Sequence, residues 1–400
     1  DRLVAGADAM DKVDVAIIGA GPVGLTLLNL LAGSGLRLAV VEQQAAALLA
    51  QPAFDGREIA LTHASQALLE KLGLWQRLPA DEVAVLRDAQ VFNGPSLFAL
   101  KIRAEQAGAE RLGHLVANQA IRRAACQAVS DCADVQLLCE TSVRAIEQRQ
   151  NEVKLVLQDG QVLQPRLLVA ADSRFSETRR QLGIGAQLKD FGKSMLVCRM
   201  QHEQDHHQVA WEWFGYGQTL ALLPLNGRQS SMVLTLPPRE IERLQKLDEA
   251  IFTREMEKRF DRRLGAMQLI SSRHAYPLVG AYARRMVGNR CALLGDAAAG
   301  MHPVTAHGFN FGLGSVQRLT EVVLAAHTRR EDNAAPAVLS RYERQHRLAT
   351  WPLYQATNLL VDVYTDDRLP LKLLRGAGLR VAQGLLPLKK GIARHLTSPG

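Results

Sequence analysis

One glycine-rich turn near its start constrains this 400-residue chain more than any other feature. The apolar run Val15-Ala16-Ile17-Ile18 leads directly into Gly19-Ala20-Gly21-Pro22-Val23-Gly24, and an apolar helical stretch follows to Leu31. A second apolar run at 38–41 ends on Glu42. This order of strand, G-x-G-x-x-G turn, helix, strand and acid is typical of a dinucleotide-binding fold.

Each of these glycines, and the acid, has a physical role in such a site. Gly19 permits the tight turn, Gly21 lets the backbone approach a pyrophosphate, and Gly24 lets helix and strand pack closely. The phosphates then lie at the positive end of the helix. Glu42, 23 residues after Gly19, is placed to accept hydrogen bonds from a ribose diol. We therefore predict that the chain binds a dinucleotide.

Length and composition predict a globular protein of two or three domains. Hydrophobic residues make up 47% of the chain and charged residues 22%, as in ordinary soluble proteins. We expect residues 1–9 to be a leader ahead of Met10, and we find no signal-peptide pattern. The five cysteines form no C-x-x-C pair and no metal-binding spacing, which favours incidental thiols in a reducing cytoplasm. We therefore expect a cytoplasmic protein without a metal site.

The C-terminal segment combines positive charge with leucines. The net charge of the chain is +8, and from Arg368 onward there are seven Lys or Arg and no Asp or Glu. Such a segment can lie on the anionic surface of the inner membrane through residues 368–395, or dock on a partner enzyme. It can equally pack on its own protein with a solvated basic face, and both alternatives stay open. Nucleic acid is not expected, because no binding motif is present and aromatic residues are only 5% of the chain.

Hydrophobic periodicity predicts the remaining elements. Helices are expected near 63–72, at 118–130, at 240–260, and from about 308 onward with breaks at Pro336, Pro352, Pro370 and Pro387. Strands are expected within 83–106 and 191–236, and at 135–139, 142–148, 153–158, 161–171 and 291–294. Asp159-Gly160 predicts a hairpin turn. The histidines at 202, 206 and 207 are expected in a surface loop.

Two further motifs each place an acid after an expected strand. Asp172 opens Asp172-Ser173-Arg174-Phe175-Ser176-Glu177-Thr178-Arg179. Far downstream, Gly295-Asp296-Ala297-Ala298 is followed by His302-Pro303 and by Gly308-Phe309-Asn310. A carboxylate in such a position can accept hydrogen bonds from neighbouring hydroxyls, and amides at a helix start can stabilise negative charge. Taken alone, each Asp could simply cap a helix.

In this order and spacing, the three motifs resemble the signatures of the single-component aromatic flavin hydroxylases, the para-hydroxybenzoate hydroxylase type, over residues 12–350. The stretches 112–118, 220–225 and 341–347 are similar to the ubiquinone-biosynthesis branch, whose members oxygenate the ring of polyprenyl phenols.

The resemblance implies a mixed α/β fold with a Rossmann-like FAD-binding domain, an inserted mixed β-sheet substrate domain and a helical C-terminal region. The FAD-binding domain is expected at 12–79 with 107–183 and 282–328. The substrate domain is expected at 80–106 with 184–281, and the basic, leucine-rich helical region at 329–400.

The resemblance also implies which residues bind the cofactor, FAD. Gly19, Gly21, Gly24 and Glu42 would hold its ADP half, and Arg57 would approach the flavin and the pyrophosphate. Asn118 would contact FAD, Asp172 would serve FAD and the passing nicotinamide, and Asp296 would bind the ribityl chain. Gly308 and Asn310 would bring backbone against the isoalloxazine. The nearest catalytic candidates are His302, Pro303 and His307.

Three positions depart from the family pattern. Ser173 replaces the usual glycine of the middle motif, Ala299 replaces a histidine, and His307 stands where the family has glutamine. His307 would lie beside the flavin, either as a hydrogen-bonding spacer or as a group that orients substrate. These changes indicate a divergent branch with its own ring position or substrate.

The implied reaction is hydroxylation of an activated aromatic ring with NADPH or NADH and O2. The nicotinamide reduces FAD, O2 adds at flavin C4a, and an electron-rich ring carbon attacks the distal oxygen of the hydroperoxide. The implied partners are a lipophilic polyprenyl phenol, O2 and other enzymes of ubiquinone biosynthesis. Alternatives left open are a hydroxylase of a small soluble aromatic, a reductase or halogenase of the same fold, and a non-catalytic FAD-binding scaffold.

Overall fold

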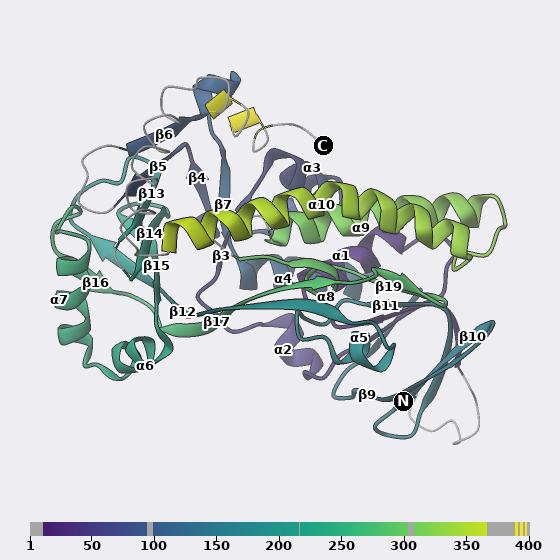
Figure 1. The fold of residues 1–400 in the computed structure, drawn as a ribbon. Helices are drawn as coiled ribbons and strands as arrows, with labels where there is room; N and C mark the ends of the chain where they lie inside the picture. The colour runs from purple at the N-terminus through teal and green to yellow at the C-terminus, as the bar shows by residue number, and fades with distance from the viewer. Residues whose placement is uncertain are drawn as a thin grey trace. The chain divides into compact units, whose positions relative to one another are not determined.

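The computed structural model describes residues 11–93, 99–215, 217–302 and 308–365, together with 389–390, 393–394 and 397 (Figure 1). The described residues fall into two compact units. The first comprises those of Asp1–Ala53, Arg122–Lys189 and Val279–Gln355, and the second those of Phe54–Ile121, Asp190–Leu278 and Ala356–Gly400.

The first unit is built on a largely parallel sheet in the order β18-β19-β11-β1-β2-β8. Its strands are β1 (Asp11–Ile18), β2 (Leu38–Val41), β8 (Val135–Leu138), β11 (Val162–Ala170), β18 (Val287–Gly288) and β19 (Cys291–Leu293). The antiparallel strands β9 (Val143–Arg149) and β10 (Glu152–Leu157) extend it from β11. All four residues of β2 are buried, as expected for a parallel strand covered on both faces.

Helices connect these strands and cover them. They are α1 (Pro22–Leu31), α2 (Ala46–Ala50), α5 (Glu177–Gln181), α8 (Asp296–Ala299) and α9 (Gly308–Thr328). Two more helices, α4 (Asn118–Ser130) and α10 (Pro336–Thr365), have residues in both units. Figure 1 shows α9 and α10 running side by side, where Arg318 Nη1 lies 3.2 Å from His346 Nδ1.

The second unit contains a sheet in the order β16-β12-β15-β14-β13-β5-β6, with β17 beside β12. Its strands are β5 (Asp88–Asn93), β6 (Ala99–Arg103), β12 (Ala186–His202), β13 (Val209–Phe214), β14 (Thr219–Pro224), β15 (Gln229–Leu236), β16 (Met267–Leu269) and β17 (His274–Ala283). The helices α6 (Pro238–Lys246) and α7 (Glu249–Arg259) share one buried core with this sheet, which includes Leu222, Phe252 and Met256.

A small antiparallel sheet, β3-β7-β4, completes the second unit. It consists of β3 (Glu58–Leu61), β7 (Gly113–Ala117) and β4 (Val83–Leu86), with α3 (His63–Lys71) and the short 3₁₀ helices Trp75–Arg77, Ala80–Glu82 and Ala104–Ala107 nearby in sequence. Leu86 and Leu115 of this sheet share a core with Leu100 of β6. Residues 54–79 and 107–121 therefore group with the larger sheet, whereas the sequence-based division assigns them to the FAD-binding domain, and 329–355 group with the first unit.

Most elements expected from periodicity are confirmed, including α4 at 118–130 and the hairpin at Asp159-Gly160, where Gly160 has φ +89°. The expected helix at 240–260 is instead two helices, because Asp248 starts a new one by accepting from Ala250 N at 2.9 Å. The expected break at Pro352 is also wrong, since this proline lies inside α10. The carbonyl of Leu348 loses its helical donor there, and Leu348 is 73% exposed, so water can serve it.

The expectation of a surface loop for the three histidines is wrong for two of them. His202 and His206 are each 4% exposed, whereas His207 lies at the surface. Buried histidines need partners: His202 bonds to Gln204 O and Ser230 Oγ, and His206 Nε2 bonds to Leu225 O at 2.8 Å. In the described part of the chain, no helix is long and apolar enough to cross a membrane.

Candidate functional site

Parallel strand pairing brings the acids of all three motifs to one edge of the first sheet. Ile18 at the end of β1 is in register with Val41 of β2 and with Ala170 of β11, and Ala170 is in register with Leu293 of β19. The segments that begin at Gly19, Glu42, Ala171 and Leu294 therefore leave the sheet at neighbouring points. This carboxyl edge is where open α/β sheets bind their ligands.

The three fingerprint glycines are distinguished by what a side chain would meet. At Gly19, which has φ +103°, a Cβ would lie 2.6 Å from Ala171 O, and at Gly24 it would lie 2.1 Å from Gly19 O. At Gly21, the residue that caps α1, it would meet no protein atom within 4 Å. The turn is thus held tightly by its own chain at two glycines and is open at the one expected to face a diphosphate.

The Glu42 carboxylate is oriented by the backbone. Ala20 N, inside the glycine turn, donates to Glu42 Oε2 at 2.8 Å, and Gln44 N donates to Oε1 at 2.9 Å. A carboxylate has about four acceptor positions, so each oxygen can still receive a hydroxyl. The geometry fits the role expected from the sequence, a ribose-binding acid attached to the phosphate-binding turn.

Asp172 serves a local capping role in this structure. Its carboxylate accepts from Ser176 Oγ at 2.5 Å and from Thr178 N at 3.3 Å, at the start of α5. This is the simpler of the two functions open to it from sequence. The Ser173 hydroxyl, at the position of the family glycine, accepts a hydrogen bond from Phe175 N.

Two arginines of the middle motif bind the third motif. Arg174 donates to Asp296 Oδ2 through Nη2 at 2.8 Å and Nε at 3.2 Å, and its Nη1 donates to Val279 O. Arg179 is 3% exposed and donates to Ala297 O and to Arg174 O. Burial lowers the pKa of the Arg179 guanidinium, and the nearby Asp172 carboxylate acts in the opposite direction.

The start of α9 packs against the same region. Gly295 has φ +55°, and its N–H donates to Ser315 Oγ, which in turn donates to Gly312 O. A Cβ on Gly312 would lie 2.8 Å from Val23 of α1, and one on Gly295 would lie 3.2 Å from the same valine. Asp296 thus stands where the starts of α1, α8 and α9 meet. Gly308, the first residue of α9, would meet no protein atom within 4 Å with a Cβ.

A separate cluster in the second unit joins Arg57 and Asn118. Both donate to Asp55 Oδ2, Arg57 Nη2 at 2.6 Å and Asn118 Nδ2 at 2.7 Å. The Tyr276 hydroxyl donates to Asp55 O, and the Arg57 guanidinium lies 5.6 Å from the centre of the Tyr276 ring. Burial alone would raise the pKa of Asp55, but Arg57 and Asn118 hold it below its ordinary value.

The second unit also contains an ion-pair cluster formed by Arg199, Glu58 and Glu82. Arg199 binds Glu58 at 2.7 Å and Glu82 at 2.9 Å, and its guanidinium lies 4.8 Å from the centre of the Phe54 ring. Burial raises the pKa of Glu58 to about 7, although Arg199 opposes the shift. Arg199 thus pairs with both glutamates, and we interpret this cluster as structural.

Sequence reasoning missed several of these residues. Asp55 binds the predicted residues Arg57 and Asn118, and Tyr276 contacts Asp55 and Arg57. The sequence around Asp55 and Tyr276 contains no motif that would have indicated this role. Arg174 and Arg179 belong to the middle motif, so their positive charge close to Asp172 was an available signal. Of the catalytic candidates, His302 is buried, whereas Pro303 and His307 lie outside the described residues. Across the described ranges, no cluster of three or more His, Cys, Asp or Glu could hold a metal ion.

Comparison with known proteins assigns the fold to a family. The sequence matches the family described as FAD binding domain over residues 12–357. It is 44% identical to ubiquinone hydroxylase UbiM of Neisseria meningitidis, over 96% of this chain and 84% of UbiM. It is 35% identical to ubiquinone hydroxylase UbiL of Rhodospirillum rubrum, over 96% of this chain and 90% of UbiL.

Among solved structures, p-nitrophenol 4-monooxygenase PnpA from Pseudomonas putida DLL-E4 is similar in fold. The TM-score is 0.77 at 18% identity, over 96% of this chain and 98% of PnpA. The predicted fold class and the predicted cofactor are thereby confirmed. Because the match spans most of its length and the two hydroxylases align with nearly all of it, the chain belongs to the FAD binding domain family and is an FAD-dependent aromatic monooxygenase.

Proposed function

We propose that this monooxygenase uses NAD(P)H and O2 to hydroxylate the ring of a polyprenyl phenol in ubiquinone biosynthesis. The observation that carries the proposal is the 44% identity to ubiquinone hydroxylase UbiM over 96% of the chain. The sequence features that resemble the same branch, at 112–118, 220–225 and 341–347, support it independently of any one relative. The alternative substrate is a small soluble aromatic, which stopped-flow spectroscopy can distinguish from a polyprenyl phenol.

The first unit fits the ADP half and the ribityl chain of FAD. We propose that the amides of the Gly19–Gly24 turn bind the diphosphate, since Gly21 opens onto space that protein atoms do not fill. Glu42 would accept from the ribose, and Asp296 from the ribityl hydroxyls. The N-terminus of α9, with Gly308 and Asn310, would place backbone dipoles against the isoalloxazine.

Roles for the remaining residues follow from their charges and partners. Arg57 is held by Asp55 and Tyr276 yet keeps nearly half of its side chain exposed, so it can bring a positive charge to the anionic cofactor. Asn118, fixed by the same Asp55, is proposed as an FAD contact. Asp172 is proposed to hold the adjacent loop for FAD and the nicotinamide, because its carboxylate orders Ser176 and Thr178.

Bound FAD supplies the redox chemistry, taking electrons from the nicotinamide and activating O2. The protein contributes orientation and exclusion of water. We propose His302, Pro303 and His307 as the residues closest to the reacting ring. We also propose that the basic segment 368–395 contacts anionic lipid, or partner enzymes of the pathway, because its sequence contains seven Lys or Arg and no Asp or Glu.

The test is anaerobic stopped-flow spectroscopy of the FAD-loaded protein with NADPH or NADH, with and without a short-tailed prenyl phenol. We expect flavin bleaching that the phenol accelerates, followed on admission of O2 by a product heavier by one oxygen atom in mass spectrometry. If a soluble phenol alone accelerates bleaching and is oxygenated, the polyprenyl substrate is wrong. If neither nicotinamide bleaches the flavin, the hydroxylase proposal itself is wrong.

A further inference from the structure

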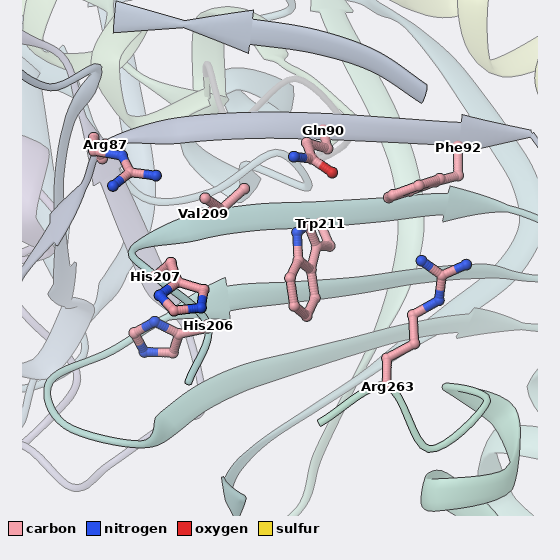
Figure 2. A pocket seen from close by; sticks show the side chains of 8 residues that line it. All are labelled: Arg87, Gln90, Phe92, His206, His207, Val209, Trp211 and Arg263. Carbon is pink, nitrogen blue, oxygen red and sulfur yellow. The ribbon is translucent and has the colours of Figure 1, made fainter. Parts of the chain in front are cut away.

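Strand β13 lies between β5 and β14 in the larger sheet of the second unit, and its side chains alternate between the two faces. Figure 2 looks onto one face, where Val209 and Trp211 of β13 and Gln90 and Phe92 of β5 line an open groove with Arg87 and Arg263. Trp213, on the same face, stacks on Phe92 with ring centres 5.3 Å apart. Glu212, between the two tryptophans, must point to the opposite face.

The side chains directly across from Glu212 on that opposite face are apolar, namely Val91 of β5 and Ala221 of β14. The polar residues Asn93 and Thr219 lie two residues further along the same two strands, on the same face. One strand further out, Val91 pairs with Leu100 of β6 and Ala221 pairs with Val233 of β15. Val91, Ala221 and Val233 are all partly exposed, and Val91 also packs against the core that contains Leu100.

The carboxyl group of Glu212 has no partner among the described residues. Among those residues it makes no hydrogen bond and no ion pair, and the loss of water on its apolar face raises its pKa to about 8. Glu58 in the same unit also has a raised pKa, but Arg199 binds it directly. Glu212 is itself partly exposed, so its carboxyl group remains open to a hydrogen-bond donor from outside the described protein.

We propose that Glu212 is the residue that binds the ring hydroxyl of the substrate, accepting its hydrogen bond while the small apolar side chains around it contact the ring. This inference rests on the proposed phenol hydroxylase function. A phenol is an O–H donor attached to a flat apolar ring, and this face offers an acceptor between apolar side chains that are partly exposed. In its ionised form, which dominates above pH 8, the carboxylate also keeps electron density on the ring oxygen, which makes the ring a better nucleophile.

The low polarity around Glu212 determines how much its hydrogen bond with the substrate hydroxyl contributes to binding affinity. Hydrogen bonds to charged groups are roughly twice as strong as neutral ones, and they strengthen where water is excluded. Loss of the hydroxyl should therefore weaken binding by about tenfold or more. The neighbours Val91 and Ala221 cannot replace the acceptor, because neither side chain carries a polar atom.

The experiment compares a short-tailed prenyl phenol with the same molecule lacking the hydroxyl, each titrated at pH 9 into the FAD-loaded enzyme and followed by the flavin absorbance change. This pH lies above the pKa of about 8 for Glu212, so its carboxyl group is mostly ionised. For the wild type we expect the phenol to bind about tenfold tighter or more. Glu212→Leu should reduce the ratio to near one, and Glu212→Gln should lower it severalfold because the neutral amide is a weaker acceptor. Glu242→Leu, an exposed glutamate of α6, is the matched control and should keep the wild-type ratio.

An unchanged preference for the phenol in Glu212→Leu would overturn the inference. If that variant fails to fold or to retain FAD, Glu212→Gln decides, and an unchanged ratio there overturns it equally. Failure of the proposed function has a different signature. If the wild type ignores the prenyl phenol but binds a small soluble phenol through Glu212, the polyprenyl substrate is wrong and the hydroxyl-binding residue stands.

Discussion

Arg174 and Asp296, 122 residues apart in the chain, form a salt bridge with Arg174 Nη2 2.8 Å from Asp296 Oδ2. Both hydrogen bonds from Arg174 to the carboxylate end on Oδ2, while Arg174 Nη1 is anchored on Val279 O. The side chains are 27% and 35% exposed, so the pair adds little to stability. Its consequence is orientation: the carboxylate proposed to bind the ribityl chain is held by an arginine of the middle motif.

Asp296→Ala should leave a folded protein that binds FAD much more weakly. The substitution removes the proposed acceptor for ribityl hydroxyls without touching the buried sheet. Arg174→Met keeps the carboxylate but releases it, so we expect a smaller loss of FAD affinity. Titration of the apoproteins with FAD, followed by flavin fluorescence, gives both dissociation constants. Full FAD occupancy in Asp296→Ala would remove this aspartate from the cofactor site.

Gly21→Val and Gly24→Ala should fail in different ways. A Cβ at Gly21 would meet no protein atom within 4 Å, so we expect the apoprotein to keep its melting temperature while FAD affinity falls by tenfold or more. A Cβ at Gly24 would lie 2.1 Å from Gly19 O, so this variant should lose about 2 kcal/mol or more of stability even without cofactor. Thermal melts of the apoproteins and FAD titrations separate the two. Equal FAD affinity in Gly21→Val and the wild type would argue against a diphosphate at this turn.

Arg179→Met should destabilise the first unit by about 1–3 kcal/mol. The guanidinium is 3% exposed and satisfies the carbonyls of Ala297 and Arg174, which methionine cannot do. The matched control is Arg180→Met, because Arg180 is 67% exposed and pairs with Glu177 at the surface. Its effect should stay within about 0.5 kcal/mol. Denaturant unfolding of both variants checks the difference, and similar losses for the two would contradict a structural role for Arg179.

Acid should destabilise the protein through His346 well above the pH at which carboxylates titrate. Burial, with Arg318 as the second cause, lowers the pKa of His346 from 6.5 to about 3. The folded state therefore resists protonation, and the stability that this histidine contributes is present above pH 6.5 and is lost as pH falls toward 3. The slope is about 1.4 kcal/mol per pH unit within that window.

Melting temperatures between pH 7 and 5 test this expectation on His346→Gln, which can still face Arg318. The pH dependence should become shallower than in the wild type. It should not vanish, because burial also lowers the pKa of His114 to about 4. An identical pH profile in the variant would show that His346 is not the group responsible.

Local sequence pattern determined a large part of this protein. Helical and strand periods and the conformation of glycine are local properties of a sequence. The sequence therefore predicted the fingerprint segment, α4 and the hairpin at Asp159-Gly160 from neighbouring residues alone. The placement of motif acids after buried strands was likewise readable, since parallel strands end at a common edge. The family resemblance followed from these motifs in their order.

Tertiary structure alone decided which side chains meet. Asp55 joins Arg57 to Asn118, and Arg174 holds Asp296, through contacts that span 63 and 122 residues. The alternation of side chains along β13 shows that Glu212 and Trp211 point to opposite faces of the sheet. Only the register with β5 and β14 shows that Glu212 lies between Val91 and Ala221. A period fixes the direction of a side chain along its own strand. What lies opposite depends on the pairing of distant strands, which no local pattern encodes.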